Sequence, residues 1–464
     1  MQSGKAVAQK DKPVEASDVF GHPRGLMFIA FTEAWERFSF YGMQALLMLY
    51  LTGYLLKPGI VETVHGFPVL QEGLEAIVGE LSLQAAASQI FGIYVGLIYL
   101  APLVGGYLGD NLLGRRRAVL IGAFAMAAGH FLMAFESAFL MAITLLVIGS
   151  GLLKGNLAAQ VGALYDPSDR RRDGAYTVYV TAINVGAFIA PLVCGTLGEF
   201  YGWHYGFGAA GVGMLVSIVI YLAGTRHLPE EVPISKIKRL PLSNSDVSKV
   251  LALSFLVAVT VLFWTVQTQV WNVYPLWLRD DVDRSVWAGA AVPVTWFQSL
   301  DAFAVLALAP LTIYLWRRQT ARGTEPSDLS KIAWGGALFA IACIALALGQ
   351  MASATEKVHI AWPVLFHFIL GAGYLYFAPV TLSVISRSAP PSTNSMMVGA
   401  YYLGIFGGGA FSGWVARFYE PLQPTAFWLL HAGIAASGAL IIVASGKRLA
   451  AILGQTEANG HTAA

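Results

Sequence analysis

Long apolar segments recur along the whole chain, separated by short polar stretches and by glycine and proline. Each is long enough to cross a bilayer, which takes roughly 20 residues of helix. A helix is expected there because it satisfies its own backbone hydrogen bonds where no water is present. The pattern predicts twelve membrane spans, at residues 25–52, 84–109, 117–136, 138–164, 174–198, 204–223, 250–278, 288–316, 331–350, 358–386, 393–416 and 424–446.

The composition indicates an integral membrane protein of the all-α class. The 464 residues are 56% hydrophobic and 12% charged, and their mean hydropathy is +0.61. Soluble globular proteins carry about 25% charged residues. We therefore expect the lipid bilayer to surround most of this chain, and nothing in its charge pattern indicates a nucleic-acid partner.

One long polar connection, residues 224–249, separates the first six predicted spans from the last six. This layout predicts two six-helix bundles, at residues 25–223 and 250–446, with polar tails at 1–24 and 447–464. In transporters built from two such bundles, the substrate lies between the halves near the middle of the bilayer.

Basic residues indicate the orientation in the membrane. Arginine clusters at 115–117 and 170–172, and the segment KIKR at 236–239, all fall on the side of the N-terminal tail. Because Lys and Arg concentrate in cytoplasmic loops, we expect both termini to be cytoplasmic, in a multi-pass protein of the cell membrane. The tail lacks the apolar core of a secretory signal.

Three charges lie within the first predicted span. At 100° per residue, Glu33, Glu36, Arg37, Tyr41 and Gln44 share one face of a helix. Each charge inside a membrane costs about 2.5 kcal/mol or more. A salt bridge that only pins helices together needs two charges, so the third favours a function. One carboxylate can pair with Arg37, and the other can bind and release a proton.

Lys154 lies near the middle of the fourth predicted span. A lysine at that depth cannot easily extend to the membrane surface, so it should face a polar cavity or a carboxylate. Its neighbours Gly149, Gly151 and Gly155 lie within a helix and not after a strand. They therefore favour close helix packing over a phosphate-binding loop.

Several segments match motifs of one known family. The stretch EAWERFSFYG (33–42) resembles the ExxERFxYY motif of the proton-dependent oligopeptide transporter (POT) family, within the major facilitator superfamily. Similar segments follow in the family's order: GGYLGDNLLGRRRAVLIGA (105–123), GSGLLKGN (149–156), YVTAINVGAFIAP (179–191) and WFQSLDAFAVLALAP (296–310). The resemblance runs through roughly residues 25–420.

The resemblance implies a symporter that imports di- and tripeptides with protons, uses no cofactor, and works as a monomer. By position in the motifs, it implies that Glu33, Glu36 and Arg37 couple the protons. Lys154 would bind the peptide carboxylate. The resemblance also places the following residues around the substrate: Tyr41, Tyr94 and Asn184.

The sequence also departs from the family pattern. Gln44 stands where the family usually has Arg, Thr268 stands at an acidic position of the seventh span, and Tyr374 replaces a Glu that contacts the peptide amine. A peptide ammonium still needs an anion, because an unpaired buried charge is expensive. Asp301, where the family has Asn, lies near the middle of the eighth span and is our candidate.

Two other functions remain open. A transporter of the same fold could move another small organic anion or nitrate, since the usual Arg and Glu are replaced at Gln44 and Tyr374. A membrane-embedded enzyme is the third possibility. It is disfavoured because the sequence contains neither an HExxH zinc site nor a GxSxG nucleophile elbow.

Overall fold

The computed structural model describes residues 18–166, 169, 171–228, 243–287, 290–353 and 356–454. Nearly all of these residues are helical. Within the described ranges, nine helical segments are long and apolar enough to cross a membrane. The protein is therefore a multi-pass helical membrane protein. Most of the predicted linker and the outer parts of both predicted tails lie outside the described residues.

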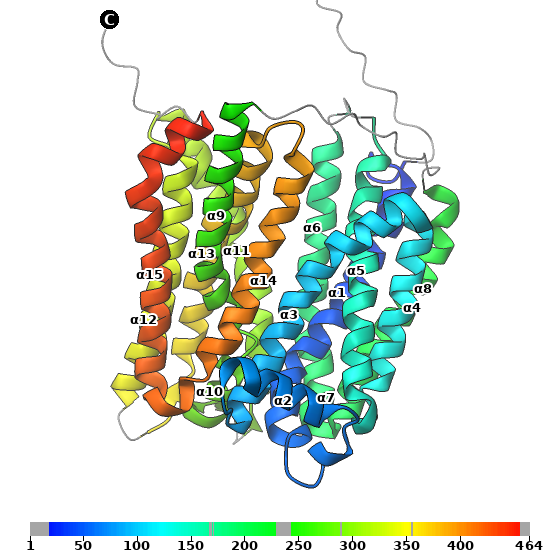
Figure 1. The fold of residues 1–464 in the computed structure, drawn as a ribbon, viewed down its shortest axis with the longest axis vertical. Coiled ribbons are helices and arrows are strands. Elements are labelled where there is room, and N and C mark those ends of the chain that lie inside the picture. Colours follow the sequence, from blue (N-terminus) through cyan, green and yellow to red (C-terminus); the bar gives the residue numbers. More distant parts are fainter. Residues whose placement is uncertain are drawn as a thin grey trace, which may run out of the picture.

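The first half of the chain forms one group of packed helices. Its elements are α1 (Arg24–Tyr50), α2 (Phe67–Val78), α3 (Leu83–Leu108), α4 (Arg115–Leu132), α5 (Phe139–Ala163), α6 (Arg171–Ala190), α7 (Thr196–Tyr201) and α8 (Trp203–Gly224). Helix α1 packs against α6 and α8, while α5 packs between α3 and α4. Figure 1 shows the long helices of this group running side by side, with the short α2 at the lower end.

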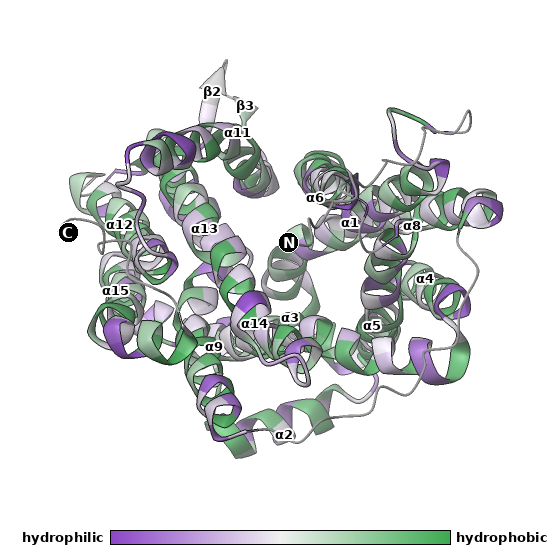
Figure 2. Ribbon diagram, turned by 90° about the horizontal axis from the view of Figure 1, so that it is seen from above, coloured by the Kyte–Doolittle hydropathy of each residue, from purple (hydrophilic) through white to green (hydrophobic). Residues whose placement is uncertain are grey.

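The second half forms a second group. Its helices are α9 (Asn244–Gln269), α10 (Tyr274–Asp281), α11 (Val294–Ala321), α12 (Asp328–Ser353), α13 (Ala361–Ser388), α14 (Asn394–Ala416) and α15 (Tyr419–Leu453). Four short strands join them: β1 (Val282–Asp283) pairs in parallel with β4 (Val358–His359), and β2 (Ser285–Trp287) pairs antiparallel with β3 (Ala290–Ala291). Seen along the helices, the two groups lie next to each other (Figure 2).

Helices α3 and α14 join the two groups through closely packed backbones. A Cβ atom on Gly92 would lie 2.4 Å from the carbonyl oxygen of Gly409, so a larger residue cannot fit without moving one helix. The second junction is between α6 and α11, where the rings of Phe188 and Phe303 lie 5.9 Å apart.

Some predicted element boundaries were wrong. The span expected at 250–278 lies within one long apolar segment, Asn244–Asp281. Its helix is interrupted between Gln269 and Tyr274, just before Pro275, which lacks the N–H that a continuous helix requires. The span expected from residue 288 begins at Val294, after the β2–β3 hairpin. Helix α15 continues past the expected end at 446 to Leu453, because Leu449 and Leu453 are still buried. The connection between the first two predicted spans contains the short helix α2.

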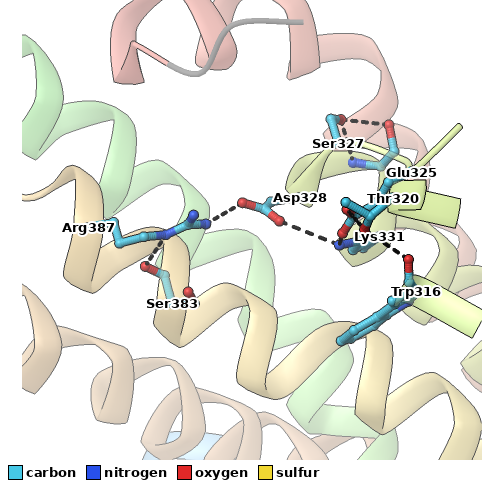
Figure 3. Close-up of polar contacts among 9 residues, drawn as sticks. Trp316, Thr320, Glu325, Ser327, Asp328, Lys331, Ser383 and Arg387 are labelled. Carbon is cyan, nitrogen blue, oxygen red and sulfur yellow. Dashed lines mark hydrogen bonds and ion pairs between the residues drawn. The ribbon is translucent and has the colours of Figure 1, made fainter. Parts of the chain in front are cut away.

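An ion-pair network ties α11, α12 and α13 together at the end of the molecule that carries the C-terminus (Figures 1 and 3). Asp328, in the first turn of α12, pairs with Arg387 near the end of α13 and lies 3.9 Å from the Lys331 ammonium. Lys331 also pairs with Glu325 in the connection from α11, and its Nζ lies 4.6 Å from the Trp316 ring centroid. The network fixes the relative positions of the three helix ends.

Candidate functional site

The three charges of α1 form a buried cluster with a tyrosine from α6. The Nε of Arg37 lies 2.7 Å from Glu33 Oε1 and 2.8 Å from Glu36 Oε2. The Tyr179 hydroxyl donates a hydrogen bond of 2.7 Å to Glu33 Oε2. Glu33 and Glu36 are 1% and 0% exposed. Helical spacing brings the charges together, because residues three and four apart share a face.

The two carboxylates of this cluster differ in their hydrogen bonds. Both oxygens of Glu33 accept one, from Arg37 and from Tyr179. Arg37 Nε carries a single N–H, which is directed at Glu33, and neither oxygen of Glu36 has a hydrogen-bond partner in the part of the chain that the structure describes. A buried carboxylate without hydrogen bonds is far more costly to keep ionised than one with two. Glu36 is therefore the carboxylate better suited to gain and lose a proton.

Lys154 of α5 lies against aromatic rings. Its Nζ is 4.0 Å from the ring centroid of Phe40 and 5.2 Å from that of Tyr99. Among the described residues this buried Nζ has no hydrogen-bond partner. It interacts electrostatically with Glu36 and Glu33 without forming an ion pair at contact distance. Cation–π contacts stabilise an ammonium but do not neutralise its charge, so the site can accept an anion.

Asp301 of α11 lies in the second half and is bound by Gln267 of α9. The Gln267 amide nitrogen is 3.2 Å from Oδ1 and 3.1 Å from Oδ2 of Asp301. Tyr41 and Tyr374 are close enough to interact electrostatically with Asp301. Each half thus contributes an ionisable group close to tyrosines: the amine of Lys154 in the first half and the carboxyl group of Asp301 in the second.

Aromatic side chains connect the two charged groups. The Tyr41 ring lies 5.3 Å from that of Trp271, across the boundary between the halves. Tyr374 packs edge-on against Trp264 at 6.2 Å. Tyr94 is buried, and its hydroxyl has no hydrogen-bond partner among the described residues. The site is therefore lined by rings with polar edges, a surface typical of small-molecule pockets.

Asn184 is not joined to the other expected residues. Its amide donates a hydrogen bond of 2.9 Å to the Val180 carbonyl, one turn earlier in α6. Sequence reasoning also missed three residues of this region: Tyr179, Tyr99 and Gln267. Tyr179 starts the quoted segment 179–191, five residues before Asn184, but no local signal showed that it would contact Glu33.

Several hydrogen bonds that join the two halves lie at the end of the molecule where α3, α11 and α15 begin. Glu199 accepts hydrogen bonds from the backbone N–H groups of Val294 and Thr295 at the start of α11. Ser82 donates to Glu420, and Arg417 donates to the Val78 carbonyl. These contacts close one end of the junction between the halves.

A two-part helical membrane protein with opposite charges on its two halves has the form of a secondary transporter. A model of the POT family matches residues 116–240 and 230–429, so the chain belongs to that family. The peptide transporter YePEPT of Yersinia enterocolitica subsp. palearctica serotype O:3 (strain YE-P4) is 28% identical, covering 91% of this chain and 94% of its own length. A di-/tripeptide transporter of Lactococcus lactis subsp. lactis (strain IL1403) is 29% identical, covering 83% and 87%. The crystal structure of a peptide transporter POT in complex with sulfate is 28% identical, covers 94% and 96% of the two chains, and has a TM-score of 0.82.

Proposed function

We propose that this chain is a proton-coupled symporter that imports di- and tripeptides across the cytoplasmic membrane by alternating access. The observation that carries the proposal is the pair of ionisable groups on opposite halves. Among the described residues, Lys154 Nζ has no hydrogen-bond partner and the Asp301 carboxyl group is hydrogen-bonded by the neutral amide of Gln267. A peptide with free termini carries the complementary pair of charges. Related chains named peptide transporters support the same substrate class.

The twelve-span arrangement is part of this proposal. To the nine apolar segments we add α1, α4 and α14, which are 27, 18 and 23 residues long. Helix α1 contains three buried charges, α4 begins with three arginines and α14 is rich in glycine, and each feature lowers mean hydropathy. Twelve spans form two bundles of six, with both termini in the cytoplasm and the protein acting as a monomer.

In this proposal Glu36 carries the coupling proton. Glu33 stays ionised between Arg37 and Tyr179, while Glu36 shares the field of Arg37 without a hydrogen bond of its own. Protonation of Glu36 removes one of the two negative charges facing Arg37, and it also removes a negative charge near Lys154. Lys154 is then free to pair with a substrate carboxylate, so proton and substrate binding favour each other. The protons are the coupling ions, and no cofactor takes part.

The peptide lies between the halves with its carboxylate at Lys154 and its ammonium at Asp301. The remaining substrate-binding residues are aromatic and polar groups around it: Tyr41, Tyr94, Asn184 and Tyr374. Contacts at Glu199, Ser82 and Arg417 hold the outer ends together, so this conformation faces inward. A substrate that attracts both halves lowers the free energy of the closed state, as alternating access requires.

Uptake by proteoliposomes tests the proposal. With an inward proton gradient, we expect accumulation of labelled alanyl-alanine, competed by unlabelled dipeptide and abolished by a protonophore. The alternative is transport of nitrate or another small organic anion. Such an anion would pair with Lys154 and leave Asp301 without a cation. Uptake of nitrate but not of alanyl-alanine would replace the proposal with that alternative.

A further inference from the structure

The side-chain amide of Gln267 uses its nitrogen to donate to Asp301, while its oxygen has no hydrogen-bond partner among the described residues. The Gln267 amide nitrogen contacts both oxygens of Asp301, whereas Gln267 Oε1 is buried and has no hydrogen-bond partner among the described residues. Gln267 is 8% exposed. Leaving a buried carbonyl oxygen without a partner is destabilising, so this oxygen is suited to receive a donor from a ligand.

The orientation of the Gln267 amide follows from electrostatics. Only the nitrogen end can face the carboxylate, because the oxygen end would repel it. When the Gln267 amide nitrogen faces Asp301, the amide oxygen Oε1 lies next to that nitrogen in the same planar amide group. A cation that approaches Asp301 from the Oε1 side of this amide can therefore contact both a carboxylate oxygen and the amide oxygen.

A primary ammonium group presents three N–H donors. Asp301 alone can balance the charge of this ammonium, but some of the ammonium N–H groups must then bond to water or to other acceptors. Thr268, the next residue on α9, donates its hydroxyl to the Trp264 carbonyl of its own helix. Of these two adjacent α9 residues, Gln267 is the one that contacts Asp301 and has an acceptor oxygen without a partner among the described residues.

We propose that Gln267 determines specificity for a primary ammonium: it positions the Asp301 carboxylate through its amide nitrogen and accepts one N–H of the ligand at Oε1. The inference rests on the proposed function, and it names the chemistry that the substrate must present at this end. A ligand with a trimethylated nitrogen has no N–H to donate to Oε1, so it loses this interaction although it keeps the positive charge.

The test compares two ligands on purified protein: alanyl-alanine and its N,N,N-trimethyl derivative, with binding measured by calorimetry. The two differ in N–H donors but keep the positive charge. We expect wild-type protein to prefer alanyl-alanine by about 10- to 100-fold, the range of one or more hydrogen bonds to a charged group. Gln267→Leu should weaken alanyl-alanine by a similar factor and leave the trimethyl derivative little changed.

Two further variants separate specificity from a general effect on folding. Gln298→Leu is the matched control, because Gln298 is buried on α11 with an unpartnered Oε1 but donates to the Val270 carbonyl and not to Asp301. It should keep the wild-type preference between the two ligands. Gln267→Asn keeps an amide with both a donor and an acceptor, and it should recover part of the preference for the primary ammonium that Gln267→Leu loses.

The ratio of the two affinities decides the outcome. An unchanged ratio in Gln267→Leu, with wild-type protein binding alanyl-alanine, would overturn the role of Gln267 and leave the proposed function standing. This holds even where both ligands bind more weakly, because a purely structural residue affects both affinities by the same factor. Wild-type protein that binds and transports no dipeptide would instead overturn the proposed function.

Discussion

The carboxylate of Glu199, in the first half of the chain, caps the start of α11 in the second half by bonding to Thr295. Glu199 Oε1 accepts from the Thr295 backbone N–H at 2.9 Å and from its hydroxyl at 2.7 Å, and Oε2 accepts from the Val294 N–H at 3.0 Å. A carboxylate at a helix N-terminus satisfies free N–H groups and the positive end of the helix dipole. Here those groups belong to the opposite half, so the cap holds the two halves together at the end of the molecule where α11 begins.

Replacing Glu199 should favour the conformation that is open to the outside. The variant Glu199→Gln loses the negative charge and one of its acceptor oxygens, while Glu199→Ala loses the cap entirely. Loss of a cap costs about 0.5–2 kcal/mol, which shifts a balanced equilibrium roughly two- to thirtyfold. The distance between spin labels at Tyr205 and Leu422, one on each half at the outer end, should increase.

The control for this prediction is Glu62→Gln. Glu62 also lies in the outer part of the chain, but it bonds to the Gly59 N–H within its own loop. The labels report on the engineered sites, since Cys194 and Cys343 are both buried. Identical distance distributions in wild type and Glu199→Ala would show that the cap does not hold the outer end closed.

Neutralising Glu36 should uncouple transport from the proton gradient. In Glu36→Gln the side chain can no longer exchange a proton, yet Arg37 keeps its hydrogen bond to Glu33. We therefore expect proton-driven accumulation of a dipeptide to disappear while exchange of internal for external peptide continues, because exchange requires no net movement of protons. Proteoliposomes assayed in both modes give the answer, and full proton-driven accumulation by this variant would contradict the assignment.

Neutralising Glu33 should have a different consequence. Glu33→Gln removes the carboxylate that accepts from both Arg37 and Tyr179. Breaking a buried pair typically destabilises by about 3–5 kcal/mol, because it leaves an uncompensated charge. We expect a clear loss of thermal stability in detergent, larger than in Glu36→Gln. Equal melting temperatures for the two variants would indicate that the carboxylates are equivalent.

Lys154 and Asp301 should discriminate opposite ends of the peptide. Truncating one partner of a desolvated charge pair loses about 2–5 kcal/mol. Asp301→Asn should therefore weaken free dipeptides strongly and N-acetylated ones little, and Lys154→Ala should weaken ligands with a free carboxylate while sparing C-terminal amides. Competition assays with the blocked peptides measure this. Equal losses for every ligand on both variants would argue for a gate in which the two residues act together.

The sequence correctly predicted features that depend on residues close together in the chain. The shared face of Glu33, Glu36 and Arg37 follows from helical spacing, and the structure brings them together. The contact of Tyr179 with Glu33 joins residues 146 positions apart, so no window of sequence contains it. For the same reason, the sequence indicated that the buried charge of Lys154 needs a polar or anionic partner, but not that its ammonium would lie against the rings of Phe40 and Tyr99.

Glu325 supplies a prediction about pH. Hydrogen bonds from Lys331 and then from Thr320 lower the pKa of Glu325 below its ordinary value of 4.5. A carboxyl group whose pKa falls on folding stabilises the folded state above the unfolded pKa, and this contribution is lost as the pH drops through the folded pKa. Because Glu325 is partly exposed, the effect is modest.

Glu325→Gln should accordingly lower the melting temperature at pH 7, where the wild-type carboxylate is ionised and bound to Lys331. The difference between variant and wild type should shrink as the pH falls below about 4.5, because the wild-type group then takes up a proton and loses the same interaction. Glu72→Gln, in the exposed part of α2, is the control and should show no such convergence. A difference that stays constant from pH 7 down to about pH 2.5 would mean that the Glu325–Lys331 pair does not stabilise the junction of α11, α12 and α13.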